Sequence, residues 1–156
     1  MATEEEKKEK LVKVLSLLVA SLAIGIYELL GDSAYALMKT VGEKILEIMQ
    51  KEMGLEISGE DPDDVLNELL RIWVDEIGMF EDAKVEATDN GWVITGNNCK
   101  GWNLTQMILK GGAKEPFTCP IMNSMSAALS KLGVKTHMKI EPVPSTKGTK
   151  FTLTRA

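Results

Sequence analysis

The sequence has 156 residues, of which 44% are hydrophobic and 26% charged, and its formal net charge is −5. A chain of this length makes about one domain and can bury a sizeable core. Its basic residues alternate with acidic ones, whereas nucleic-acid binding needs a basic face, so we expect no nucleic-acid partner.

The start of the chain and its cysteine content predict a cytoplasmic protein. The first residues, "MATEEEKKEKLVK", begin acidic, whereas a secretory signal begins with a basic region. Two cysteines, Cys99 and Cys119, are too few for a disulfide framework. We therefore expect a reducing compartment.

Residues 4–30 are predicted to form one long helix, and its stretch "LVKVLSLLVASLAIGIYELL" is strongly apolar. The longest part without a charge runs from Val14 to Tyr27, which is shorter than the about twenty residues of a spanning helix. We therefore expect no membrane span. A helix that is apolar on most sides is either central to a core or covered by a second subunit. We expect residues 1–31 to serve in a homodimer, with binding to a membrane surface as the alternative.

Two amphipathic helices are predicted next. The first begins near Asp32 or Ser33 and ends near Gly54. The second has Asp61 as its cap and Pro62 at its first position. Its expected buried stripe consists of Val65, Leu69, Ile72, Trp73 and Ile77.

The apolar period then changes to that of strands. "TDNG" predicts a hairpin with strands at about 82–88 and 91–96. "CKGWNLTQMILKGG" and "CPIMNSMSAALSKLG" predict two helices, and "KTHMKIEPV" with "TKFTLTR" predicts a second hairpin. We expect a single α+β domain over residues 1–156, in which N-terminal helices and a central helix pair pack on a four-stranded antiparallel sheet.

Signals for catalysis are weak. The one histidine, His137, falls in a predicted strand, where a lone histidine is usually a surface or hydrogen-bonded residue. "GNNCKGW" has neither the Lys-Ser/Thr of a phosphate-binding loop nor the glycine pattern of a dinucleotide fold. We therefore expect a protein that is not an enzyme.

The cysteines leave several roles open. Cys99, Cys119, His137 and Glu141 could be metal ligands, but structural zinc needs four ligands and no CxxC pair anchors them. We expect no zinc or other cofactor. Cys119 begins a predicted helix, where the helix dipole favours a thiolate, so a redox role is one alternative. A buried cysteine that packs as a small apolar residue is the other.

Methionine and tryptophan side chains are concentrated in the region of the first hairpin and the two following helices. They could fill the core or line a pocket for an apolar small molecule, because methionine suits both. The candidate ligand-binding residues are Trp92, Trp102, Met107, Met122 and Met125.

The segment "CPIMNSMSAALSKLGVKTHMKIEPVPSTKGTKFTL" has Cys119 at a helix start, Leu132-Gly133 at the helix end, Glu141 in a strand and Gly148 in a turn. With this order of residues it resembles the 4-vinyl reductase domain, a small-molecule-binding module whose fold also occurs in subunits of the TRAPP vesicle-tethering complex. In metal-binding members of that family, zinc is held by the helix-opening cysteine, the acidic residue and two later cysteines.

This chain departs from the family pattern at the metal site. Pro144 stands where the third ligand belongs, and no cysteine follows Gly148. Two ligands cannot hold a structural zinc ion. The resemblance therefore implies that Cys119 and Glu141 are the remnant of a degraded site.

The resemblance implies a non-catalytic domain that holds an apolar or aromatic molecule between helices and sheet. A protein–protein scaffold like the vesicle-tethering subunits is the alternative. A reductase-type enzyme is a third, although no nicotinamide or flavin motif supports it.

Overall fold

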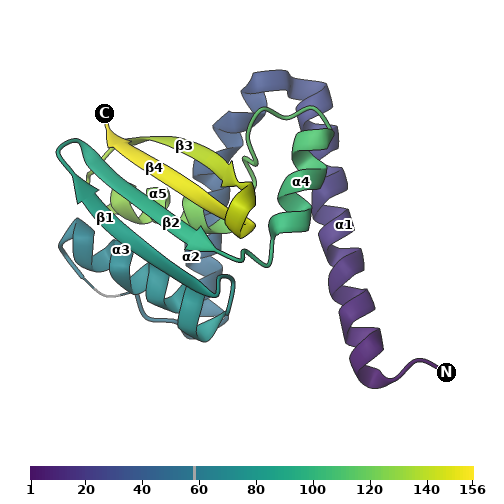
Figure 1. Ribbon diagram of the computed structural model, residues 1–156. Coiled ribbons are helices and arrows are strands. Elements are labelled where there is room, and N and C mark those ends of the chain that lie inside the picture. Colours follow the sequence, from purple (N-terminus) through teal and green to yellow (C-terminus); the bar gives the residue numbers. More distant parts are fainter. Residues whose placement is uncertain (58) are drawn as a thin grey trace.

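The computed structural model describes residues 1–57 and 59–156. Its helices and strands follow one another as α1 (Glu4–Leu30), α2 (Leu37–Lys51), α3 (Pro62–Arg71), β1 (Asp82–Thr88), β2 (Gly91–Asn97), α4 (Trp102–Lys110), α5 (Pro120–Lys131), β3 (Thr136–Val143) and β4 (Gly148–Arg155) (Figure 1). This order confirms the predicted α+β fold.

The four strands form one antiparallel sheet in the order β1-β2-β4-β3. The two hairpins were predicted, and they meet through β2 and β4, where Trp92 lies opposite Leu153 and Ile94 opposite Phe151. These four side chains are buried. Because side chains alternate between the two faces of a strand, they place the core on one face of the sheet.

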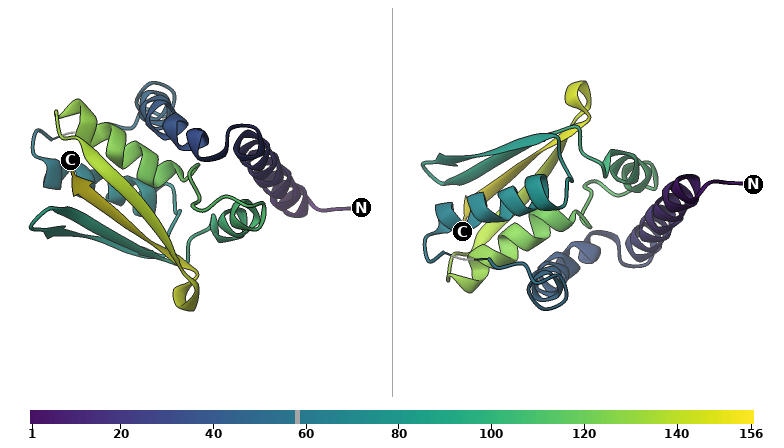
Figure 2. Two further views of the ribbon diagram at one scale, coloured as in Figure 1. Left: turned by 90° about the horizontal axis from the view of Figure 1, so that it is seen from above. Right: turned by 90° about the horizontal axis from the view of Figure 1, so that it is seen from below.

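Helices α3 and α5 cover this core face, and α2 packs on the side of α5 that is away from the sheet (Figure 2). The crossing of α2 and α5 is close. A Cβ atom at Gly42 would lie 2.0 Å from the backbone oxygen of Asn123. Gly42 therefore allows the two backbones to touch.

Side chains cap the starts of α1 and α3, and the cap of α3 is the one predicted from the sequence. Thr3 and Glu6 form a capping box at the start of α1. Asp61 accepts a hydrogen bond of 2.9 Å from the backbone N–H of Asp63, and Pro62 is the first residue of α3.

The prediction that Asp32 or Ser33 caps the second helix is wrong. A 3-10 turn at Gly31–Ala36 leads into α2, whose start has no side-chain cap. The Asp32 carboxylate instead accepts hydrogen bonds from Tyr27 and Lys114. The cap is not needed, because backbone hydrogen bonds continue from α1 through the turn into α2.

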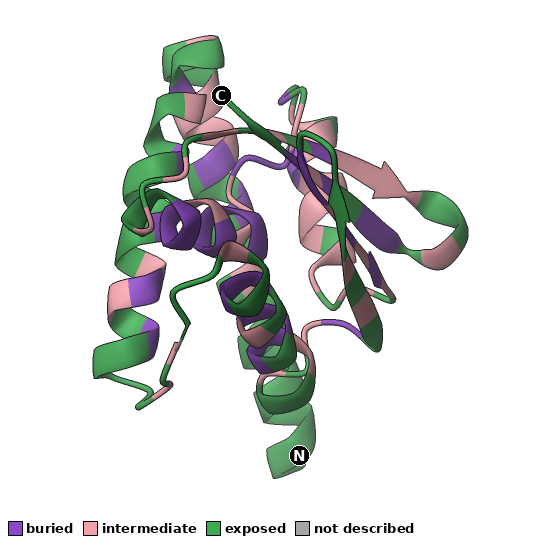
Figure 3. Ribbon diagram, turned by 90° about the vertical axis from the view of Figure 1, so that its left-hand side faces the viewer, coloured by how far each residue is buried: buried purple, intermediate pink, exposed green. Residues whose placement is uncertain are grey.

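Helix α1 lies outside the layered body, against α4 (Figure 1). Its turns next to the N-terminus are exposed in Figure 3. Only Ala20 and Ala23 of its 27 residues are buried. The stretch Glu4–Lys51 is long and apolar enough to cross a membrane, with a mean hydropathy of 2.0 in its best window, and only 11% of that window is buried. Of the alternatives drawn from the sequence, a helix central to the core is therefore wrong.

Candidate functional site

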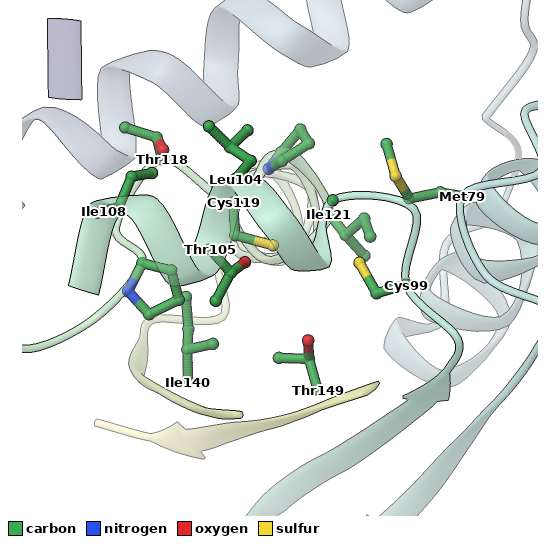
Figure 4. A pocket seen from close by; sticks show the side chains of 13 residues that line it. Met79, Cys99, Leu104, Thr105, Ile108, Thr118, Cys119, Ile121, Ile140 and Thr149 are labelled. Atoms are coloured by element: carbon green, nitrogen blue, oxygen red, sulfur yellow. The ribbon is translucent and has the colours of Figure 1, made fainter. Parts of the chain in front are cut away.

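A cavity of about 80 Å³ lies between α4, the start of α5 and the ends of β3 and β4 (Figure 4). Its wall is mostly aliphatic, with Leu104 and Ile108 from α4, Ile121 from α5 and Ile140 from β3. Both cysteines also line it, and their sulfur atoms point inward in Figure 4. The remaining lining residues are Met79, Gly101, Thr105, Pro116, Thr118, Pro120 and Thr149.

Cys99 is placed by a turn between β2 and α4. Its backbone N–H donates to Lys147 O at 3.0 Å, and its carbonyl accepts from Trp102 N at 3.0 Å. Lys100 N donates to Met79 O at 2.9 Å. The turn is therefore tied both to the β3–β4 loop and to the segment before β1, which fixes the Cys99 side chain at the cavity wall.

Cys119 is the N-cap residue of α5, with Pro120 at the first helical position. Its side chain makes no capping hydrogen bond, so the thiol is available to the cavity. The loop before it is held by Asn123, whose Nδ2 donates to Phe117 O at 3.0 Å. Phe117 itself is buried.

The environment of the cavity keeps both thiols protonated. Burial raises the pKa of the Cys119 thiol to about 12, and this effect outweighs the backbone N–H groups of Met122 and Ile121, which favour the thiolate. Burial also raises the pKa of the Cys99 thiol, while the Gly101 backbone and Thr149 act in the opposite direction. At neutral pH the two side chains therefore behave as small apolar groups and not as nucleophiles.

The five candidate ligand-binding residues are not brought together, and none of them lines this cavity. Met122 and Met125 are fully buried in α5. Trp92 is buried under the Arg155 guanidinium, which lies 4.5 Å from the ring centroid, and its Nε1 donates to Asp63 Oδ1. These three side chains fill the core or its edge.

The other two candidates lie on α4. Trp102 is the first residue of this helix and is half-buried. Met107 is half-buried and lines a surface groove between α1 and α4, together with Leu17 and Lys110 among others.

Glu141 is placed apart from the thiols. It follows Ile140, which points into the cavity, so strand alternation directs the Glu141 side chain to the opposite face. There its carboxylate forms an ion pair of 3.1 Å with Lys139. Within residues 1–57 and 59–156, no three His, Cys, Asp or Glu side chains are grouped closely enough to share a metal ion.

An aromatic cluster joins the end of α1 to the loop that leads to Cys119. Tyr35 packs edge-on against Phe117 at 5.6 Å between ring centroids, and Tyr27 lies 5.9 Å from Tyr35. The Tyr27 hydroxyl donates to Asp32 at 3.0 Å, and desolvation and this bond raise the pKa of Tyr27 to about 12. Lys114 Nζ lies 2.6 Å from the same carboxylate. The loop is therefore held from the α1 side.

Sequence reasoning identified the two cysteines but missed the aliphatic wall of the cavity. Leu104 and Ile108 are four residues apart on α4, a spacing that places both on one helix face. That spacing could have marked them as inward-facing. The sequence could not show that this face lies against Ile140, because α4 and β3 are brought together only by the tertiary fold.

The fold is similar to that of a solved vesicle-tethering subunit. A structure of trafficking protein particle complex subunit 3 from Naegleria fowleri, covalently bound to palmitic acid, matches with a TM-score of 0.58 and 13% sequence identity. The match covers 92% of this chain and 96% of that one. It supports the TRAPP part of the resemblance at the level of fold. No curated protein matches the sequence.

A family model identifies the family of this chain. The match runs over residues 15–156, from within α1 to the last residue. The comparisons do not show membership of the 4-vinyl reductase family. The chain belongs to the family described as "Putative rubredoxin C-terminal domain".

Proposed function

We propose that this chain is a non-catalytic binding domain, and that its cavity takes an apolar group such as the end of a hydrocarbon chain. The observation that carries the proposal is the composition of the wall. Four aliphatic side chains and two protonated thiols face the same space. Among the described residues, none that lines this space is charged. Such a wall favours a ligand without charge.

The volume limits the part of a ligand that fits. An engineered cavity of about 150 Å³ in another protein holds benzene, and this cavity of about 80 Å³ is smaller. It fits a group of a few carbon atoms, and the rest of a longer chain would lie outside. The palmitic acid of the similar vesicle-tethering subunit supports a hydrocarbon ligand. Binding here is proposed as non-covalent, because raised thiol pKa values disfavour the thiolate that a covalent bond needs.

Thermal unfolding in the presence of linear alcohols from butanol to decanol tests this proposal. A ligand that binds only the folded state raises Tm. The increase should grow over the first few carbons and then level off, because the enclosed space is filled. Absence of any increase along the series would contradict the proposal.

A pair of variants locates the binding. Thr105→Phe fills the cavity from α4 and should abolish the alcohol-dependent increase in Tm. Thr95→Phe is the matched control, because Thr95 follows the inward-facing Ile94 on β2 and lies on the uncovered face of the sheet. Equal stabilisation of both variants by alcohols would place the binding elsewhere.

A second candidate function is assembly with another protein, as in a scaffold. The exposed apolar side chains of α1 favour it, since soluble monomers rarely expose large contiguous apolar patches. The fold shared with a vesicle-tethering subunit also supports it. In this case binding at α1 and binding in the cavity are independent, and the alcohol experiment reports only on the cavity.

A further inference from the structure

The exposed apolar residues of α1 include a stripe of leucines with a regular spacing. Leu11, Leu15, Leu18, Leu22 and Leu29 follow one another at intervals of four, three, four and seven residues. These intervals are those of a heptad seam, in which positions a and d face a partner helix. Gly25 occupies the one remaining seam position between Leu22 and Leu29.

This leucine stripe faces away from the body of the protein. At about 100° per residue, its five members fall within an arc of roughly 60°. Ala20 and Ala23, the buried residues of α1, lie roughly 150° away around the helix axis by the same geometry. The exposed fractions of the five leucines run from 52% for Leu15 to 85% for Leu29.

We infer that the leucine stripe binds the same stripe of a second copy of this chain, as an antiparallel helix pair. Two-fold dimers are the commonest closed assemblies, and a self-complementary seam suits them. The leucines would interdigitate as in a short coiled coil. Val12, Val14 and Val19, which flank the stripe and are exposed, would widen the buried seam.

Charge supports the antiparallel direction. When Leu15 faces the partner's Leu18, the heptad positions flanking the seam place Lys7 beside the partner's Glu28. The symmetry of the pair gives this contact twice. A parallel pair would instead place Lys7 beside the partner's Val12, which has no charge to offer.

A membrane is the other occupant that an apolar helix suggests, and the surroundings of α1 disfavour it. The groove between α1 and α4 is lined by Lys13, Lys100 and Lys110. If α1 spanned a membrane, it would either separate from α4 or place the lysines of this groove in the hydrocarbon layer, which is energetically costly. A helix lying on an anionic surface usually has a basic polar face, whereas the first turns of α1 carry four glutamates and three lysines over residues 4–10.

The mass of the full chain in solution tests the inference. Sedimentation should give twice the chain mass of 17.1 kDa. Leu15→Glu/Leu18→Glu should give a monomer with unchanged helical circular dichroism, because both leucines are exposed on the single chain. Leu17→Glu is the matched control, since Leu17 is 45% exposed on another side of α1, and it should remain a dimer.

A charge exchange tests the direction of the pair. Lys7→Glu should raise the dimer dissociation constant several-fold, and adding Glu28→Lys should restore it. A monomeric wild-type chain, or a dimer that survives Leu15→Glu/Leu18→Glu, would overturn the inference. So would a wild-type chain that remains monomeric but floats with phosphatidylcholine–phosphatidylglycerol vesicles, which would make the membrane the occupant. If Leu15→Glu/Leu18→Glu abolished the dimer but neither charge change altered its dissociation constant, the antiparallel direction would be wrong.

Discussion

At the scale of single residues, the central feature is that the cavity suppresses ionisation of the thiols. A cysteine at a helix start is expected to have a lowered pKa because of the helix dipole. Cys119 has the opposite shift, with burial as the largest cause. The residue is therefore adapted to an apolar site, and the sequence could not show this because burial depends on side chains from α4 and β3.

The raised pKa predicts a specific dependence of stability on pH. In the unfolded chain the Cys119 thiol loses its proton near its ordinary pKa of 9.0, and in the folded chain near 12. Between these values the folded state binds more protons, so the free energy of unfolding falls as pH rises. Urea unfolding between pH 8 and pH 10.5 should show this loss.

Cys119→Val removes the titrating group while keeping an apolar side chain of similar size. The fall in stability over this alkaline range should be smaller in the variant than in the wild type. Cys99→Val provides the comparison for the second thiol, whose pKa is also raised. If the free energy of unfolding fell equally steeply with pH in the wild type and in Cys119→Val, the Cys119 thiol would not be buried and protonated as described.

The candidate ligand-binding residues also show the limit of sequence reasoning at this scale. Aromatic and methionine side chains serve cores and pockets equally well. The burial of Trp92 was foreseeable from strand periodicity. The burial of Met122 was not foreseeable from helical periodicity, because all residues from Ile121 to Met125 of α5 are buried. The separation of these side chains from the cavity could not be predicted, because periodicity shows which face of an element points inward but not which residues that face contacts.

At the scale of elements, the backbone contact between α2 and α5 predicts a strong effect of one methyl group. Gly42→Ala would place Cβ 2.0 Å from Asn123 O, so the helices must separate. Overpacking of this kind typically costs about 1–3 kcal/mol. The free energy of unfolding, measured by urea denaturation, should fall by about 1–3 kcal/mol or more.

Gly25→Ala is the control for this substitution. Gly25 lies in the interior of α1, and a Cβ atom added there would meet no atom within 4 Å. Alanine there should raise helix stability by up to about 1 kcal/mol. If Gly42→Ala were as stable as the wild type, the close crossing of α2 and α5 would be wrong.

Most element boundaries could be predicted because their signals are local. The Asn-Gly turn, the Asp61-Pro62 start and the paired glycines after α4 depend on residues next to each other in the sequence. The pairing of β2 with β4 joins residues far apart in the sequence, such as Trp92 and Leu153, so no local signal could reveal it.

At the scale of the whole molecule, the chain consists of a packed α+β body and an apolar helix that this body leaves uncovered. The body buries its core between the sheet, α3, α5 and α2. The apolar character of α1 was readable from the sequence, but its exposure required knowledge of the layers. The cavity and the leucine stripe lie on different parts of this arrangement, so each can be tested without the other.

Binding of a hydrocarbon group in the cavity can be observed by isoleucine-methyl NMR during titration with hexanol. We predict that the methyl signals of Ile108, Ile121 and Ile140, which line the cavity, shift together and reach saturation. Ile94, which is buried outside this lining, should not shift. Saturable shifts at Ile94 without shifts at the three lining residues, or no saturable shift at any of them, would contradict this prediction.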